Sequence, residues 1–192
     1  MNKNTLIIVD FQVDFCSKKG SLYVPSAEKA MTQILKLLNS EKINRVLFTV
    51  DWHPITHSSF KENGGIWPVH CVQYSTGASI PNQLIEACYK NKIPYEVIRK
   101  GTDPSYEQYS GFINLKDNDN YVTVTSNKEK FRISKKENLT ICGLAGDFCV
   151  YESVKSLCQY LHPSIFKKGI GYISDTDKLD NLMKEQNLVE IK

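Results

Sequence analysis

The sequence predicts an α/β protein in which a mainly parallel sheet carries helices on both faces. Short apolar runs, typical of buried strands, alternate along the chain with segments whose apolar residues recur at helical spacing. The chain has 192 residues, within the range of one domain, and shows no internal repeat, low-complexity tract or linker. We therefore assign residues 1–192 to a single domain.

The expected elements follow one another in alternating order. The strands cover residues 6–9, 46–50, 95–99, 121–125, 139–145 and 171–174. The helices cover residues 27–38, 80–89, 148–161 and 178–186, with Ser26 as the predicted cap of the first. Residues 54–79 are rich in Gly, Pro, Ser and His, and a loop of that length in a compact domain is usually functional. Residues 101–137 show little pattern beyond the short strand at 121–125.

Composition excludes several classes of protein. A net charge of +3 with scattered basic residues does not indicate a nucleic-acid surface. No run of about 18 apolar residues predicts a transmembrane helix, and the chain enters its first strand too early for a signal peptide. We therefore expect a cytoplasmic protein without a membrane or nucleic-acid partner. The six cysteines form no CxxC pattern, so most are expected to be reduced and buried.

Reactive side chains come directly after four of the expected strands. In chain order they are Asp10, Asp51 with His53, Lys100, and Cys149. In open parallel α/β sheets, ligands bind outside the carboxyl ends of the strands. If these strands share one sheet, a carboxylate, a pair of metal ligands, a cation and a thiol meet at one edge. This set of groups favours hydrolysis by a cysteine nucleophile beside a metal ion.

Cys149 begins a helix just after the small-residue turn Ala145-Gly146. A helix N-terminus lowers the pKa of a thiol, because its free N–H groups and dipole favour the thiolate. The same N–H groups can bind the oxyanion that forms when a carbonyl is attacked. The alternative is a buried structural cysteine, which is the interpretation that fits Cys142 and Cys158.

Asp10 and Lys100 each allow two interpretations. A carboxylate at the end of a buried strand could activate a thiol, although most acidic residues are simply solvated caps or turn residues. A lysine that ends an apolar strand can equally reach for water. Both become functional candidates if they lie near Cys149.

Asp51 and His53 are two residues apart, so in an extended strand end they point the same way and could grip one metal ion. A third ligand from the following loop, either His70 or His57, would leave positions open for substrate. Imidazole and carboxylate ligands suit zinc, iron or manganese, and the ligand types do not choose among them. The competing interpretation is a group of surface histidines in a loop.

Aromatic side chains accompany each part of this candidate site. Phe15 lies shortly after Asp10, Trp67 lies in the histidine-bearing loop, and Tyr109 follows Lys100. Each could wall a flat aromatic ligand, or could serve only as packing.

Taken together, these residues resemble the nicotinamidases of the isochorismatase-like cysteine hydrolase family. The resembling segments are residues 6–16, 51–60, 67–72, 99–101, 109–112 and 143–150, in the family's order. The most specific are Asp51-Trp52-His53-Pro54 and the Trp67-Pro68 pair followed by His70-Cys71-Val72. One departure is Gly146, where the family often has Thr, and a glycine there would loosen the turn.

The resemblance implies an Asp10–Lys100–Cys149 catalytic triad. It implies one divalent metal ion held by Asp51, His53 and His70, with His57 as a fourth candidate. Phe15, Trp67 and Tyr109 would bind the substrate ring, and the N–H groups of Ala145 and Cys149 would hold the oxyanion.

The expected reaction is the hydrolysis of nicotinamide to nicotinate and ammonia, in NAD salvage. The substrate is the expected partner, and a homo-oligomer is compatible with the pattern. Two rivals stay open: a hydrolase of the same fold acting on another small amide or on isochorismate, and a non-catalytic binding module. The metal ligands argue against the first, and the complete triad argues against the second.

Overall fold

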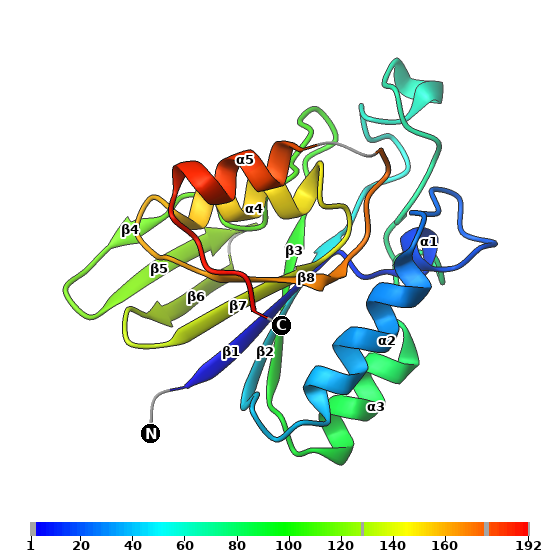
Figure 1. The fold of residues 1–192 in the computed structure, drawn as a ribbon. Coiled ribbons are helices and arrows are strands. Elements are labelled where there is room, and N and C mark those ends of the chain that lie inside the picture. Colours follow the sequence, from blue (N-terminus) through cyan, green and yellow to red (C-terminus); the bar gives the residue numbers. More distant parts are fainter. Residues whose placement is uncertain (1–2, 128, 175–176, 192) are drawn as a thin grey trace.

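A five-stranded parallel sheet forms the centre of the protein (Figure 1). The computed structural model describes residues 3–127, 129–174 and 177–191. The strands of this sheet, in spatial order, are β3 (Tyr95–Lys100), β2 (Arg45–Asp51), β1 (Asn4–Val9), β7 (Asn138–Gly143) and β8 (Ser164–Ile170). Every pairing is parallel, as the alternation of strands and helices predicts.

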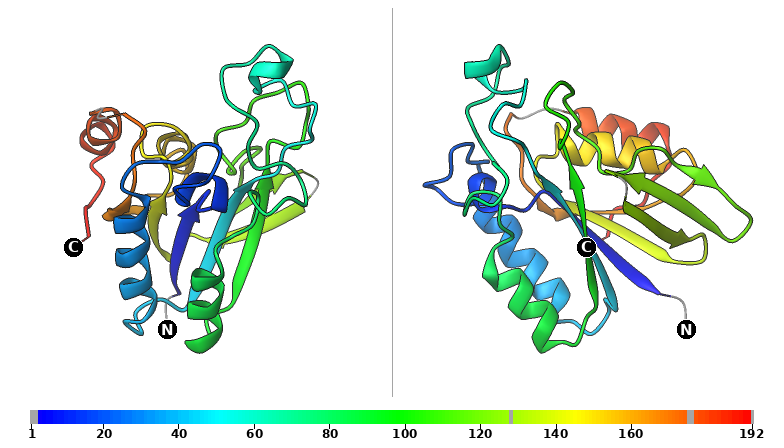
Figure 2. Two further views of the ribbon diagram at one scale, coloured as in Figure 1. Left: turned by 90° about the vertical axis from the view of Figure 1, so that its right-hand side faces the viewer. Right: turned by 180° about the vertical axis from the view of Figure 1, so that it is seen from behind.

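Helices cover both faces of this sheet, which confirms the predicted architecture. Figures 1 and 2 show α2 and α3 on one face, and α4 and α5 on the other. The helices are α1 (Val13–Cys16), α2 (Ala27–Leu38), α3 (Asn82–Lys90), α4 (Cys149–Leu157) and α5 (Lys178–Glu185), with a 3₁₀ turn, η1 (Lys61–Asn63). Among the described residues, no helix has the length and apolar character needed to cross a bilayer.

A small antiparallel sheet lies beside the parallel one. It consists of β4 (Lys116–Asp117), β5 (Tyr121–Ser126) and β6 (Glu129–Ser134). The sequence predicts only the strand at 121–125. It does not predict β6, because charged residues alternate there with Phe131 and Ile133 and no long apolar run marks a strand. Phe131 and Ile133 nevertheless point inward and join the same core as the large sheet.

The structure corrects four details of the sequence prediction. Residues 171–174 are not a strand. The last strand is β8, which was not predicted because two lysines and a glycine interrupt its apolar run. The strand expected at 139–145 ends at Gly143, where φ is +123° and the chain leaves the ladder. The helix expected at 148–161 ends at Leu157. Ser26 lies at the start of α2 with φ +69°, and its side chain makes no capping hydrogen bond.

The register of the sheet brings the strand ends level. Val9 of β1 lies opposite Thr49 of β2 and Gly143 of β7, so Asp10 follows directly at the same edge. On the other side of β2, Asp51 is paired with Lys100. This edge is where the loop of residues 54–79 projects from the molecule (Figure 2).

Arg45 is buried, forms two ion pairs, and links the two sheets by donating to the carbonyl oxygen of Arg132 in β6. Arg45 of β2 contacts Glu137, with 3.0 Å between Nη1 and Oε2, and Glu96, with 2.7 Å between Nη2 and Oε1. The side chains of Arg45 and Glu137 are 8% and 6% exposed. Breaking such a pair by removing one partner leaves an uncompensated buried charge.

Arg45→Met should therefore lower the free energy of unfolding by about 3 to 5 kcal/mol, measured by urea denaturation. The matched control is Arg99→Met, because the Arg99–Glu129 pair is 47% and 40% exposed and should contribute less than about 1 kcal/mol. Equal losses in the two variants would contradict this role for Arg45.

Candidate active site

Lys100 lies at the centre of the site and is fully buried. Its Nζ is 2.8 Å from Asp10 Oδ2 and 2.5 Å from Asp51 Oδ1, and it also donates to the carbonyl oxygen of Gln108 at 3.1 Å. Burial alone lowers the pKa of a lysine, but Asp10 and Asp51 outweigh it and hold the pKa of Lys100 well above its usual value. Lys100 is thus a fixed cation between two carboxylates.

Asp10 leaves strand β1 with φ +45°, which turns its side chain toward Lys100. Thr49 Oγ1 donates a 2.7 Å hydrogen bond to Oδ1. Among the described residues, Oδ2 receives no hydrogen bond of good geometry, although Lys100 lies beside it. Burial raises the pKa of Asp10 to about 6, while Lys100 opposes the rise. Asp10 is thus a carboxylate able to take up a proton near neutral pH.

Cys149 is the first residue of α4, and its Sγ lies 3.6 Å from Lys100 Nζ. Burial raises the pKa of this thiol well above its usual value; Lys100 lowers it, whereas Asp10 and Asp51 raise it further. Burial and the two carboxylates thus oppose the thiolate that the helix N-terminus alone would favour. Cys149 therefore needs a base if it is to attack a carbonyl carbon.

Around the turn before Cys149, two backbone N–H groups have no hydrogen-bond acceptor among the described residues. The carbonyl oxygen of Ala145 accepts hydrogen bonds from the N–H groups of Phe148 and Val150. The N–H groups of Ala145 and Cys149 themselves donate to no acceptor in the part of the chain that the structure describes. They are thus free to bind an oxyanion.

Asp51, His53 and His70 form a buried group that fits a metal ion. One candidate ligand atom from each lies within 4.8 Å of the other two. The Nε2 atoms of His53 and His70 are 3.6 and 3.9 Å from the Asp51 carboxylate. The Nδ1 atoms bond the carbonyl oxygens of Gly101 and Pro68, each at 2.8 Å. Such backbone bonds to Nδ1 orient the Nε2 lone pairs toward a cation.

An orphaned atom supports this assignment. His53 Nε2 is buried and has no hydrogen-bond partner among the described residues. Burial lowers the pKa of His53, but Asp51 outweighs it and raises the pKa above its ordinary value, so the site attracts positive charge. Gly101 makes room for this ring: it has φ +63°, and a Cβ atom there would lie 2.3 Å from His53 Cε1.

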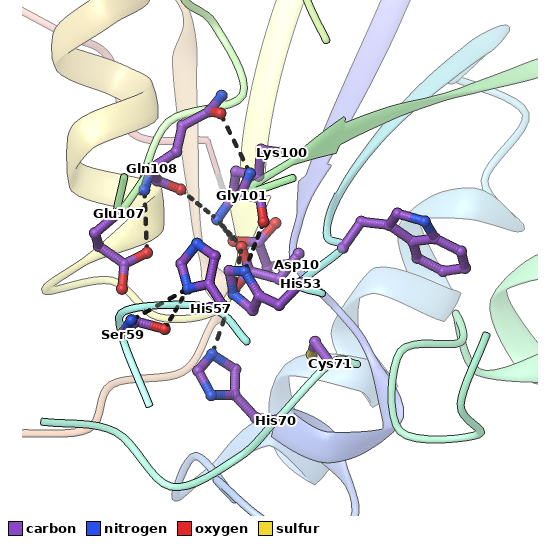
Figure 3. A network of polar contacts seen from close by, with 12 residues as sticks. Asp10, His53, His57, Ser59, His70, Cys71, Lys100, Gly101, Glu107 and Gln108 are labelled. Carbon is purple, nitrogen blue, oxygen red and sulfur yellow. Dashed lines mark hydrogen bonds and ion pairs between the residues drawn. The ribbon is translucent and has the colours of Figure 1, made fainter. Parts of the chain in front are cut away.

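His57 does not belong to the metal-binding group. Its Nδ1 accepts a 2.7 Å hydrogen bond from Ser59 Oγ, and its Nε2 donates to the carbonyl oxygen of Tyr106 at 3.2 Å. Both ring nitrogens are therefore engaged. The His57 ring packs on the His53 ring, with 4.0 Å between centroids, so it helps to hold the His53 ring in position (Figure 3).

One cavity joins the two groups. Its lining includes the predicted Phe15, Trp67, Tyr109 and Ala145 together with Cys149, Asp51 and His70. Trp67 Nε1 donates to the Tyr109 hydroxyl at 3.3 Å, which fixes both rings. Sequence reasoning missed the rest of the lining, which is Leu22, Val24, Glu107, Phe148 and Ile173. Of these five residues, only Phe148 could have been predicted from sequence, because it directly precedes the candidate nucleophile Cys149.

Comparison with known proteins gives a consistent result. No protein-family model matches the chain. The chain is similar to the nicotinamidase of Escherichia coli (strain K12), with 31% identity over 176 residues, covering 83% of this chain and 78% of the relative.

Two solved structures share the fold. One is PnC1 from L. infantum in complex with nicotinate, with a TM-score of 0.80 and 27% identity, covering 100% of this chain and 93% of that one. The other is the pyrazinamidase of Pyrococcus horikoshii in complex with zinc, with a TM-score of 0.74 and 26% identity, covering 99% of both chains.

His53→Ala and His70→Ala should each lose most of the bound metal, because each removes one of three ligands. Elemental analysis of the purified proteins after dialysis measures this. His57→Ala is the matched control and should retain its metal, since both nitrogens of that ring bond other groups. Metal loss in His57→Ala equal to that in His70→Ala would overturn the assignment.

Proposed function

The chain belongs to the nicotinamidase family, and we propose that it hydrolyses nicotinamide to nicotinate and ammonia, with Cys149 as the nucleophile. One observation carries the proposal. Lys100 contacts both Asp10 and Asp51, so one side chain joins the candidate triad to the candidate metal ligands. An amide held in this cavity would lie beside Cys149 and Ala145 and against the rings of Phe15 and Trp67. The Asp10 carboxylate lies within 4.8 Å of the Cys149 sulfur and would serve as the base.

The residues around the cavity suit a flat pyridine carboxamide. Phe15 and Trp67 offer aromatic surfaces for the ring. Asp51, His53 and His70 would hold a divalent ion, which supplies a Lewis acid for a ring nitrogen when bound. Zinc is our choice of metal, because two imidazoles and a carboxylate suit it and a related structure contains it. Iron or manganese would fit the same donors.

The first half of the reaction forms a thioester. Asp10 Oδ2, which lacks a good hydrogen-bond donor, takes the proton from the Cys149 thiol as the sulfur attacks the carboxamide carbon. The carbonyl π bond opens, and the N–H groups of Ala145 and Cys149 stabilise the oxyanion. Asp10 then gives its proton to the departing nitrogen, so ammonia leaves and a thioester remains.

The second half repeats these roles with water. Asp10, ionised again, removes a proton from a water molecule as the water oxygen attacks the thioester carbon. The new tetrahedral intermediate collapses, the sulfur leaves, and Asp10 returns the proton to Cys149. Nicotinate departs, and the enzyme is back in its thiol form. Lys100 favours the ionised form of Asp10 throughout.

Cys149→Ala should abolish ammonia release from nicotinamide while leaving the metal content unchanged, because the alanine keeps the fold but cannot form a thioester. Cys158→Ala is the control, since Cys158 lies at the end of the same helix away from the cavity. An active Cys149→Ala variant would refute the nucleophile.

Asp10→Asn keeps the shape of the side chain but cannot take up a proton. It should lower kcat by roughly 10²-fold or more, measured as steady-state ammonia release. KM should change less than kcat, because Asp10 acts on the thiol and not on the ring. Unimpaired turnover would leave the triad without a base.

Benzamide distinguishes this function from that of a general amidase of the same fold. It matches nicotinamide but lacks the ring nitrogen, so its kcat/KM should be lower by roughly tenfold or more. Equal processing of the two amides, by a preparation without metal, would favour the rival. A cytoplasmic location, a role in NAD salvage and a homo-oligomer stay predictions.

A further inference from the structure

One wall of the cavity comes from a segment that belongs to neither sheet. Ile173 lines the cavity together with Phe15, Trp67 and Cys149. It lies in residues 171–174, which follow β8 without continuing its ladder. This wall therefore depends on other contacts for its position.

A buried carboxylate beside the nucleophile supplies those contacts. Asp147 is 3% exposed. Its Oδ1 accepts the N–H of Ile173 at 3.2 Å, and its Oδ2 accepts the N–H and the hydroxyl of Ser174 at 2.9 and 2.8 Å. Burying a carboxylate is costly unless several donors compensate it, and every one of these donors comes from the wall segment.

Close packing against Gly146 also fixes residues 171–174. The N–H of Gly146 donates to the carbonyl oxygen of Gly171 at 2.8 Å. A Cβ atom on Gly146 would lie only 2.2 Å from Tyr172 Cε1, so the Tyr172 ring occupies the space of a side chain there. The turn before Cys149 and residues 171–174 therefore fit together as one unit, and Gly146 permits this close packing where the sequence suggested a looser turn.

We propose that Ile173 is a specificity-determining residue that limits which ring substituents a pyridine carboxamide can carry, and that Asp147 is the positioning residue that holds it in place. This rests on the proposed function. The mechanism above uses neither residue: Asp147 is engaged with the wall, and Ile173 contributes only an aliphatic surface. Their effect is on the shape of the cavity that Cys149 also lines.

The experiment compares kcat/KM for nicotinamide with kcat/KM for its ring-methylated isomers, by ammonia release. Ile173→Ala should raise the ratio of methylated to parent substrate by roughly tenfold or more for at least one isomer, because a pocket discriminates a methyl group by about that factor. Asp147→Asn and Ser174→Ala should raise the ratio for the same isomer by a smaller factor, since each releases the wall without shortening Ile173.

Asp180→Asn is the matched control. Asp180 also belongs to the C-terminal part of the chain, where it pairs with Lys167, but it lies outside the cavity. Its selectivity ratio should equal that of the wild type. A residue with only a structural role would lower both rates together and leave the ratio unchanged.

An unchanged ratio in Ile173→Ala for every isomer would overturn the specificity role. An unchanged ratio in both Asp147→Asn and Ser174→Ala would overturn the positioning role, and Ser174→Ala alone decides it if Asp147→Asn fails to fold. Failure of the proposed function would show differently, as a wild-type protein that releases no ammonia from nicotinamide.

Discussion

Lys100 is a fully buried cation, and its two carboxylate neighbours come from two other strands. Burying any one of these three charges alone would be strongly unfavourable. Together they are compensated, because the ammonium group lies within 3 Å of both carboxylates. The parallel register of β1, β2 and β3 makes this possible, since it brings the ends of these strands level. The Cys149 sulfur lies 3.6 Å from the same ammonium group, so the three candidate catalytic groups meet at Lys100.

The Lys100 ammonium group affects the pKa values of Asp51 and Asp10 to different extents. Burial would raise the pKa of Asp51, but Lys100 and His53 outweigh it and hold that pKa well below its usual range, so Asp51 stays ionised as a metal ligand requires. Asp10 has the weaker compensation, and its pKa of about 6 suits a group that gains and loses a proton in each cycle. Burial and both carboxylates raise the pKa of Cys149 above its usual value, which is why the proposed mechanism gives Asp10 the role of base.

Much of this could be predicted from sequence, because a chemical residue at the end of an apolar run is a local signal. Asp10, Asp51 and Lys100 each follow such a run, and the parallel sheet brings them together. The state of Cys149 could not be predicted, since it depends on burial and on charges from distant strands. The exclusion of His57 depends on bonds to Ser59 and Tyr106 that spacing does not reveal. Ile173 was missed because residues 171–174 were predicted to be an ordinary strand, with no reactive residue to mark the segment as part of a site.

The direct test of the central role of Lys100 is the pH dependence of kcat/KM for wild type and Lys100→Met, with metal content measured alongside. In the wild type, Asp10 must be ionised to act, so activity should fall with decreasing pH near its pKa of about 6. In Lys100→Met, burial and Asp51 raise the pKa of Asp10 without the opposing charge of Lys100, so this acid limb should move to higher pH and activity at neutral pH should collapse. A Lys100→Met enzyme whose acid limb stays in place would contradict the account.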